Sequence, residues 1–456
     1  MVVQHNISAM NANRMLGITQ GSLSKSTEKL SSGYKVNRAA DDAAGPSISE
    51  KMRKQIRGLD QASANAEDGI SAVQTAEGAL TEVHDMLQRM NELAVKASNG
   101  TMSLDDRQTV QDEVDQLLTE IDRVAETTKF NETYLLKGDT DTKQKTLSAH
   151  DAGLEGTLRE GSTTATFTMS KLSIGDTYTI GGTEYTIAGA DAAAIKGADA
   201  FKGGLANGEL IDVDGVQYTV SAANNEDKNQ LTWTDIQKKI TDDSVVKYNG
   251  KTYATTKHGN VDTSFITDTV AYGKVQQELT LANKIGNDGT TKAAVAAGKV
   301  NANDTKKYDF VITKGTASVK ETLNVGLHVG ADADMNNKIT VGIDAMDTAG
   351  LGIKGLNVKD STGTAATYAI DAIADAVAKV SAQRSSLGAV QNRLEHTINN
   401  LDNVVENTTS AESQIRDTDM ADEMVKYSKN NILQQAGQSM LAQANQSNQG
   451  VLSLLG

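Results

Sequence analysis

The chain has 456 residues and a formal net charge of −15, and its length predicts about three domains rather than one. It has no cysteine, which excludes disulfides and thiolate metal sites. The acidic balance argues against nucleic acid and against anionic lipid, because both partners require a basic surface. One Trp, one Pro and 4% aromatic residues are too few for an ordinary compact enzyme core and favour helices packed along their length.

The first 33 residues have apolar side chains at helical spacing, but two glycines lie inside the run. Gly17 and Gly21 each cost about 1 kcal/mol relative to Ala in a helix. We therefore expect this segment to be marginal or unfolded when it is alone in water. The apolar positions of the segment are Val3, Ile7, Met10, Leu16, Leu23 and Leu30.

Residues 52–93 carry a sustained apolar stripe at steps of three and four, which predicts a long helix packed on other helices. Pro46 and the Ser47-x-x-Glu50 pattern, a capping box, mark the expected start of this helix, and Asn99-Gly100 marks its end. A second helix is expected to begin at Ser103, with Asp106 three residues later. Glu77 and His84 interrupt the stripe, and we interpret them as solvated or partner-facing positions.

Residues 140–360 are rich in Thr and Gly and alternate in polarity, which indicates strands and turns. Three segments share one design: a short strand, a turn ending in Gly, and a return strand with Tyr three positions later (Tyr185, Tyr218 and Tyr253). Asp-Gly and Asn-Gly at such turns favour two-residue hairpins. The spacing of the tyrosines suggests diverged ββα-like repeats, with helices near 191–201 and 234–240.

The last segment, residues 364–456, returns to helical spacing and then loses its charge. No charged side chain follows Lys429, yet apolar residues continue to recur among many Asn and Gln. A helix of this kind is expected to be buried against other copies of the chain, and a disordered Gln-rich tail is the alternative. The apolar positions that we assign to polymerisation and coiled-coil contacts are Val3, Ile7, Met10, Leu23 and Leu30 in the first segment, and Met424, Tyr427, Ile432, Met440, Leu452 and Leu455 here.

No constellation of residues predicts catalysis, a metal or a cofactor. The six histidines have no pair at ligand spacing, and the phosphate-loop and nucleophile-elbow motifs do not occur. Asp332-x-Asp334-x-Asn336 resembles the start of a calcium loop, but Asn337 stands where Gly is expected and Ile343 where a bidentate Glu is expected. We interpret this segment as a polar turn, and we predict that the protein is not an enzyme.

Both ends of the chain resemble bacterial flagellin, over about 230 residues. The matching N-terminal motifs are Asn6-Ile-Ser-Ala-Met-Asn-Ala, Leu30-Ser-Ser-Gly-Tyr-Lys-Val-Asn, Ala40-Asp-Asp-Ala-Ala-Gly45 and Glu120-Ile-Asp-Arg-Val-Ala. The matching C-terminal motifs are Arg384-Ser-Ser-Leu-Gly-Ala-Val-Gln-Asn-Arg-Leu-Glu-His-Thr-Ile398 and Ser413-Gln-Ile-Arg-Asp-Thr-Asp-Met-Ala421. The middle matches no named family, although its style resembles flagellins of clostridial-type bacteria.

The resemblance implies an elongated multidomain protein, mainly α at its termini, with an inserted α+β variable region that contains β-hairpins. Residues 1–44 and 406–456 would form inner-tube coiled-coil helices of a helical homopolymer. Residues 45–139 and 361–405 would form an outer-tube helical bundle, and residues 140–360 would be exposed to solvent.

The resemblance also implies where the protein acts and with what. It would be exported through the flagellar type III apparatus without a cleaved signal peptide and would lie in the extracellular filament that drives motility. This overrides the cytoplasmic location that the N-terminus alone predicts, since it lacks the features of a secretory signal. The implied partners are copies of itself, an export chaperone, and the flagellar cap and junction proteins.

A host partner, the Toll-like receptor that senses flagellin, is implied by two further matches. Recognised flagellins present an Arg, a Leu four residues later and a Glu on the next helix, and these correspond to Arg89, Leu93 and Glu113. Arg89 lies between stripe positions and is expected to be exposed, while Leu93 is read either as an exposed contact or as stripe packing. Asn91 departs from the charged residue that many relatives carry.

Three alternatives remain at this point. A hook-filament junction protein shares flagellin-like ends, and its low abundance would distinguish it from a filament subunit. The hairpins could instead form a filament-displayed glycan adhesin if Tyr185, Tyr218 and Tyr253 shared an exposed face. An enzyme inserted in the variable region has no motif to support it.

Overall fold

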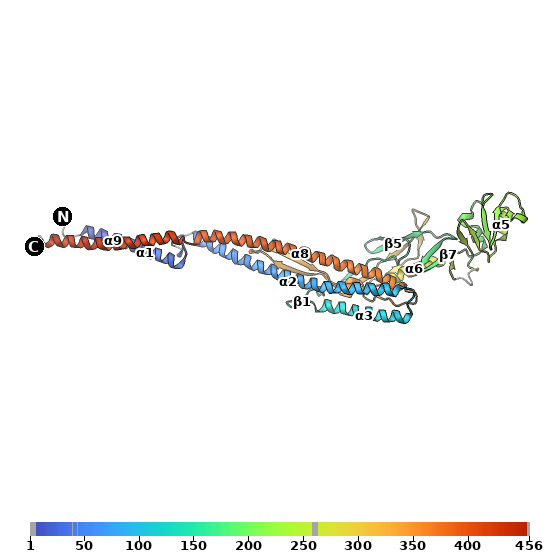
Figure 1. The fold of residues 1–456 in the computed structure, drawn as a ribbon, viewed down its shortest axis with the longest axis horizontal. Helices are drawn as coiled ribbons and strands as arrows, with labels where there is room; N and C mark the ends of the chain where they lie inside the picture. Colours follow the sequence, from blue (N-terminus) through green and yellow to red (C-terminus); the bar gives the residue numbers. More distant parts are fainter. Residues whose placement is uncertain (1–5, 39, 43, 258–262, 454–456) are drawn as a thin grey trace. The chain divides into compact units, whose positions relative to one another are not determined.

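The computed structural model describes residues 6–38, 40–42, 44–257 and 263–453 (Figure 1). The chain forms two compact units. The terminal unit consists of Met1–Ile70, Gly326–Thr340 and Gln391–Gly456, and the central unit consists of Ser71–Val325 and Val341–Val390. Within the described ranges, no helix is long and apolar enough to cross a membrane.

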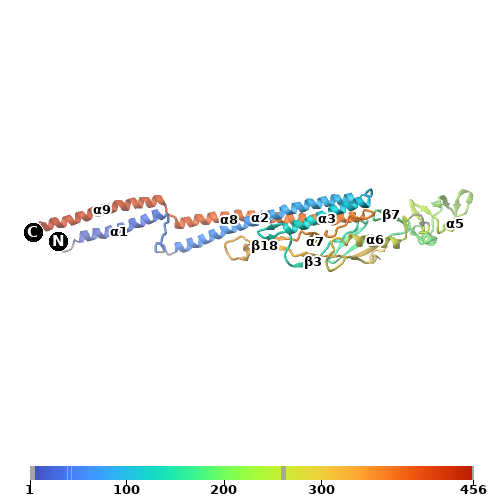
Figure 2. The ribbon, with the colours of Figure 1, turned by 90° about the horizontal axis from the view of Figure 1, so that it is seen from below.

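In the terminal unit, α1 (Ile7–Ser32) lies beside α9 (Met420–Ser453), as Figures 1 and 2 both show. The Asn6 side chain caps the start of α1 by accepting a hydrogen bond from the Ala9 N–H. Gly33 ends the helix with φ of 77°, a left-handed conformation that glycine adopts without strain. Gly17 and Gly21 lie inside α1 and do not interrupt it.

The long helices α2 (Gly45–Ser98) and α8 (Thr364–Arg416) contribute to both units. In the terminal unit, the Ser49 hydroxyl of α2 donates a 2.7 Å hydrogen bond to Glu412 of α8. The predicted capping box at Ser47 is wrong, because α2 already begins at Gly45 and Ser47 lies inside its first turn. Pro46 suits that turn, where a missing N–H removes no helical hydrogen bond.

In the central unit, the apolar stripe of α2 forms the core together with α8 and α3 (Leu104–Thr127). The capping box of Ser103 and Asp106 at the start of α3 is confirmed. Arg107 is almost fully buried, and its guanidinium donates to the carbonyl oxygens of Ala97, Asn99 and Asp360. The core positions that are at most 2% exposed include Val73, Ala76, Leu80, Val83, Leu87, Met90, Val114, Ile121, Ile373, Val380 and Leu387.

The three predicted hairpins are confirmed, and each has two central turn residues with positive φ, as a type I′ turn requires. The turn residues are Gly181-Gly182, Asp214-Gly215 and Asn249-Gly250. The hairpin strands are β6 (Thr177–Ile180) with β7 (Thr183–Ile187), β8 (Leu210–Val213) with β9 (Val216–Val220), and β11 (Val246–Tyr248) with β12 (Lys251–Tyr253).

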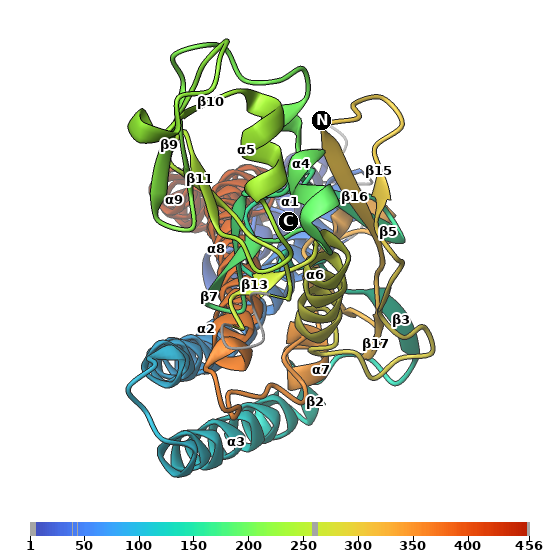
Figure 3. The same cartoon turned by 90° about the vertical axis from the view of Figure 1, so that its right-hand side faces the viewer.

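The repeats are nested rather than serial. After β9, the strand β10 (Gln230–Leu231) pairs parallel to it and leads into α5 (Trp233–Lys239), which lies against this sheet (Figure 3). The first hairpin has the same design, since β13 (Phe265–Ile266) pairs parallel to β7 and leads into α6 (Asp268–Ala282). The other two hairpins therefore lie in the chain between β7 and its own third strand.

The remaining elements complete the central unit and the hairpin that it shares with the terminal unit. The sheet order β14-β16-β5-β4 and the pairs β17-β3, β18-β19 and β1-β2 are antiparallel where their registers are given. Phe167 and Phe310 are fully buried in the core between the first of these sheets and α6. The bounds are α4 (Ala192–Lys196), α7 (Thr348–Leu351), β1 (Lys129–Phe130), β2 (Thr133–Tyr134), β3 (Thr142–Thr146), β4 (Thr157–Glu160), β5 (Thr164–Ser170), β14 (Ala294–Val295), β15 (Lys299–Val300), β16 (Lys307–Thr313), β17 (Thr316–Lys320), β18 (Leu323–His328) and β19 (Lys338–Ile343).

Candidate functional site

The seam between α1 and α9 is built from small and polar side chains with a few leucines. Gly437 of α9 lies against Leu16 of α1, where an added Cβ would be 3.3 Å from the leucine Cδ1. The Asn6 amide donates a 3.1 Å hydrogen bond to the Ala444 carbonyl. The seam positions, spaced by three and four residues, are Ala9, Ala12, Leu16, Thr19, Leu23, Ser26 and Leu30 on α1, and Glu423, Tyr427, Asn431, Gln434, Gly437, Leu441 and Ala444 on α9.

Large apolar side chains outside the seam are exposed, and we call the sides of α1 and α9 that carry them the outer faces. Val425 and Ile432 are 68% and 67% exposed, and helical geometry places these two on the side of α9 opposite Glu423 and Leu441. Exposed large apolar side chains in this number are costly to leave in water and mark a surface that another molecule covers. The exposed apolar residues are Ile7, Met10, Met15 and Ile18 on α1, and Met420, Met424, Val425, Ile432, Leu433 and Met440 on α9.

The residues predicted for polymerisation therefore divide between two surfaces. Leu23, Leu30 and Tyr427 are half-buried on the seam. Val3 and Leu455 lie outside the described residues, and Leu452 lies in α9 with its side chain outside the described part. The others are on the exposed outer faces, outside the seam. These exposed residues are Ile7, Met10, Met424, Ile432 and Met440.

Glu423 is a seam residue that sequence reasoning missed, and it is buried although it is charged. Its carboxylate accepts a hydrogen bond from the Ser26 hydroxyl and lies 3.3 Å from the Lys426 Nζ. The hydrogen bond from Ser26 is the largest cause that lowers the pKa of Glu423. The three- and four-residue spacing that links Leu23, Ser26 and Leu30 is the signal that could have found this seam.

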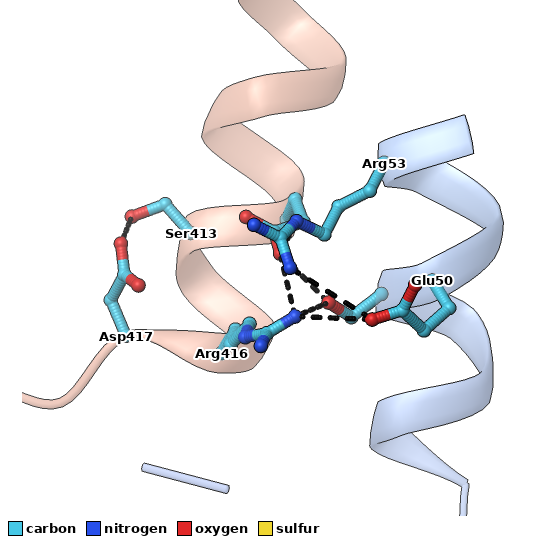
Figure 4. Close-up of polar contacts among 7 residues, drawn as sticks. Glu50, Arg53, Ser413, Arg416 and Asp417 are labelled. Carbon is cyan, nitrogen blue, oxygen red and sulfur yellow. Dashed lines mark hydrogen bonds and ion pairs between the residues drawn. The ribbon is translucent and has the colours of Figure 1, made fainter. Parts of the chain in front are cut away.

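A cluster of charged residues lies where α8 ends and α2 begins (Figure 4). We call Ser49, Glu50, Arg53, Glu412 and Arg416 the arginine–glutamate cluster. The Nη1 of Arg416 lies 3.5 Å from Glu50 and 3.9 Å from Glu412. Arg53 lies 3.8 Å from the same Glu50 and 3.9 Å from the same Glu412. Each glutamate therefore faces both arginines.

Both connections to the terminal helices meet at this cluster. The Lys35 N–H donates to the Arg416 carbonyl at 2.7 Å, and the Thr418 N–H donates to the Gly33 carbonyl at 3.0 Å. The Tyr34 ring lies over the Arg416 guanidinium, with 4.6 Å between the ring centroid and Cζ. The segment after α1 and the segment before α9 are thus held side by side by backbone and side-chain contacts.

The receptor residues predicted from the sequence lie on α2 and α3. Arg89 Nε donates a 2.9 Å hydrogen bond to Glu113, and Arg89 Nη1 donates a 3.1 Å hydrogen bond to Glu92. Arg89 is exposed, as expected, and Glu113 is half-buried. Leu93 is only 2% exposed, so the expectation of an exposed contact is wrong for this subunit. Its stripe position points it into the helical core.

The tyrosines of the hairpins do not form a shared exposed face. Tyr253 is buried, and Tyr218 is half-buried against the same apolar core. Tyr185 packs against a different core, the one that contains Phe167. These side chains contribute to packing, and the observation that would have supported a glycan adhesin is not present.

In the part of the chain that the structure describes, no group of three or more His, Cys, Asp or Glu residues could hold a metal ion. Asp334 caps a short 3-10 helix by accepting a hydrogen bond from the Asn336 N–H, as a polar turn would. Glu77 forms an ion pair with Arg384 at 3.7 Å, and the His84 Nε2 lies 2.8 Å from the Gln88 amide nitrogen.

Comparison with known proteins identifies both helical ends. Residues 3–141 match the bacterial flagellin N-terminal helical region, and residues 370–455 match the bacterial flagellin C-terminal helical region. A flagellin of Clostridium tyrobutyricum is 38% identical over 452 residues, covering 98% of this chain and 100% of that protein. A flagellin of Bacillus subtilis (strain 168) is 35% identical over 457 residues, covering 100% of each. The chain is also similar to the solved structure of FliC from Burkholderia pseudomallei, with 19% identity and a TM-score of 0.29; the match covers 71% of this chain and 99% of that chain.

Exposed apolar side chains on both terminal helices are typical of a structural protein whose surface is covered by other chains in an assembly. The chain belongs to the bacterial flagellin family and is a subunit of the flagellar filament. The predicted recognition, including the clostridial resemblance, is confirmed, as is the fold class of terminal helices with an inserted α+β region. Its relatives are structural flagellins of the extracellular filament.

Proposed function

We propose that α1 and α9 are the helices through which one subunit contacts the next in the filament. The observation that carries this proposal is the set of large apolar side chains on the outer faces of both helices. Fully burying a Met, Leu or Ile side chain contributes about 1.5–3 kcal/mol. Several such side chains covered by neighbouring copies would offset the cost of ordering two helices in an assembly.

The layers of the filament follow from the same proposal. Residues 1–44 and 406–456 form the inner coiled-coil layer, residues 45–139 and 361–405 form the surrounding helical bundle, and residues 140–360 face solvent. Helix α8 continues unbroken to Arg416, and the break before α9 falls at residues 417–419. The inner layer on the C-terminal side would therefore begin at this break, with residues 406–416 belonging to the continuous helix.

Seeded elongation of full-length subunits, followed by electron microscopy, tests the role of the outer face. Ile432→Gln removes an apolar side chain that is 67% exposed, and Gln435→Ala changes an exposed polar position on the same helix as a matched control. We expect the control to elongate seeds normally and Ile432→Gln to require a higher subunit concentration. Equal elongation by both variants would overturn the assignment of this face.

The proposal extends to the partners that act before and during assembly. Until a subunit is incorporated, an export chaperone would cover the outer face of α9, and the flagellar cap and junction proteins would meet the same terminal helices. Export through the flagellar type III apparatus without a cleaved signal peptide belongs to the same proposal. The mass of the protein from extracellular filaments, compared with that of the cytoplasmic subunit, tests whether any segment is removed.

We further propose that the host Toll-like receptor for flagellin binds at Arg89 and Glu113. The buried Leu93 would hold α2 in position by packing in the helical core. The exposed pairing of Arg89 with Glu113 presents charges from two helices at one place. The double variant Arg89→Ala with Glu113→Ala is expected to weaken receptor binding. The pair Glu120 and Arg123 on α3 is a matched control, because it is also an exposed ion pair. Binding that is unchanged by the first double variant contradicts the site.

A further inference from the structure

The methionines of the chain differ widely in exposure. There are 13 methionines and no cysteine, so methionine carries all of the sulfur that an oxidant can reach. Met90, Met169 and Met346 are buried in the central unit at 0%, 2% and 3% exposure. Five others lie on the outer faces of α1 and α9, and all of these are between 48% and 66% exposed. These five, which we call the outer-face methionines, are Met10, Met15, Met420, Met424 and Met440.

Oxidation of a thioether changes the property for which these residues are suited. A two-electron oxidant such as hydrogen peroxide transfers one oxygen atom to the methionine sulfur, giving a sulfoxide, and is itself reduced to water. The sulfoxide is polar and accepts hydrogen bonds, whereas the thioether is apolar and packs adaptably. When such a face is covered, a sulfoxide must lose its water and find a hydrogen-bond donor, whereas the thioether needs neither.

We propose that the outer-face methionines are a peroxide modification site of the free subunit, and that their oxidation to sulfoxides prevents the subunit from joining the filament. The inference rests on the proposed function, since it requires that these faces be covered by neighbouring subunits. The same requirement limits the oxidation to the period before the subunit is incorporated. Sulfurs that are accessible in the free subunit become shielded once the subunit is incorporated, so a finished filament resists the oxidant that stops its growth.

The charge pattern of α9 supports selective sensitivity at this place. No charged side chain follows Lys429, so no ion pair from this part of α9 can contribute to assembly around Met440. The apolar contact of the Met440 side chain therefore carries more of the free energy of association there. A sulfoxide there is expected to raise the critical concentration for elongation by roughly tenfold if the side chain becomes fully buried.

The test uses full-length subunits treated with hydrogen peroxide, with the sites of oxidation located by peptide mass spectrometry. Treated and untreated subunits are added to filament seeds, and the critical concentration for elongation is measured. A variant with the five outer-face methionines replaced by Leu, which conserves volume and apolar character, is treated in parallel. We expect oxidation to stop elongation by the natural subunit and to leave the Leu variant unaffected.

Met335 provides the matched control within the same chain. It is 74% exposed and lies in the short 3-10 helix of the β18–β19 hairpin, away from α1 and α9 in sequence. Met335→Gln mimics a polar product at that site, and Met440→Gln mimics it on the outer face of α9. We expect Met440→Gln to raise the critical concentration and Met335→Gln to leave it unchanged.

A rescue separates oxidation at sulfur from other damage. Methionine sulfoxide reductase with a dithiol removes the oxygen atom, forming water and a disulfide in the dithiol, and should restore elongation. The inference is overturned if subunits fully oxidised at all five positions elongate seeds as well as untreated ones. If untreated subunits and the Leu variant both fail to elongate seeds, the proposed function fails instead.

Discussion

Helix α9 and the middle of helix α2 carry apolar residues at similar spacing, but only those of α2 are buried within the chain. In α2, the stripe positions Val73, Ala76, Leu80, Val83, Leu87 and Met90 are at most 1% exposed, because α3 and α8 cover them within the same chain. In α9, Ile432 is 67% exposed and Met440 is 64% exposed. The side that α9 turns to α1 is lined by small and polar residues. One helical period can therefore encode a core or a contact between molecules, depending on whether the same chain or a neighbouring one covers the apolar side chains.

The largest effect is expected from a substitution in the core of the central unit. Leu87→Ala removes a fully buried side chain from the core of the central unit and should destabilise it by about 2–5 kcal/mol, through lost transfer free energy and the cavity that remains. Ile432→Ala, at an exposed position of α9, should change the stability of the free subunit by less than about 0.5 kcal/mol. Chemical denaturation of the two variants measures the difference, and equal destabilisation would remove the distinction between the two helices.

An intermediate effect is expected at the arginine–glutamate cluster. Arg416→Met keeps an unbranched apolar stem but removes the guanidinium, which leaves the partly buried Glu412 without its neighbour on the same helix and should cost about 1–3 kcal/mol. The amides of Lys35 and Thr418 report this loss, because both form hydrogen bonds across the two connections. Their hydrogen exchange should become faster. Arg53→Met is the control and should have a smaller effect, since Arg53 is more exposed than Arg416.

The smallest effect is expected at the seam between α1 and α9, and it depends on pH. The hydrogen bond from Ser26 lowers the pKa of Glu423 in the folded pair, so the ionised carboxylate contributes stability above the ordinary pKa of glutamic acid. That contribution is lost as the pH falls through the lowered pKa. Glu423→Gln should remove this acid sensitivity while changing stability at neutral pH by about 1 kcal/mol or less. Amide exchange of α1 and α9 between pH 3 and 7 (an acid window set by the ordinary pKa of glutamate) measures it.

Much of the fold follows from local sequence rules. The three hairpins form where two-residue turns ending in Gly supply both positive φ values, and α3 begins where Ser103 and Asp106 cap each other. Such features depend on a few adjacent residues, so the sequence is sufficient to predict them. The nested order of the repeats depends on the parallel pairing of β13 with β7, a contact between distant segments that no local signal encodes.

The candidate site was predicted only in part, and the reason lies in the composition of its two faces. Apolar spacing identified the residues of α1 and α9 but not which of them meet each other, because the intramolecular seam is built around Thr19, Ser26 and Gln434 rather than a continuous apolar stripe. Glu423 was missed because a charged residue is rarely buried without a partner, and its partner Ser26 lies on the other terminal helix. For Leu93, spacing allowed both readings, and α2 and its neighbours bury it.

The most direct test of the central claim is the accessibility of the α9 outer face before and after assembly. The chain has no cysteine, so Ile432→Cys creates a unique site for a thiol-reactive label, and Lys228→Cys in the inserted region is the control. We predict rapid labelling at residue 432 in the free subunit and strongly slowed labelling in the filament, with residue 228 labelled equally in both. If residue 432 is labelled at the same rate in the filament as in the free subunit, neighbouring subunits do not cover this face and the account is wrong.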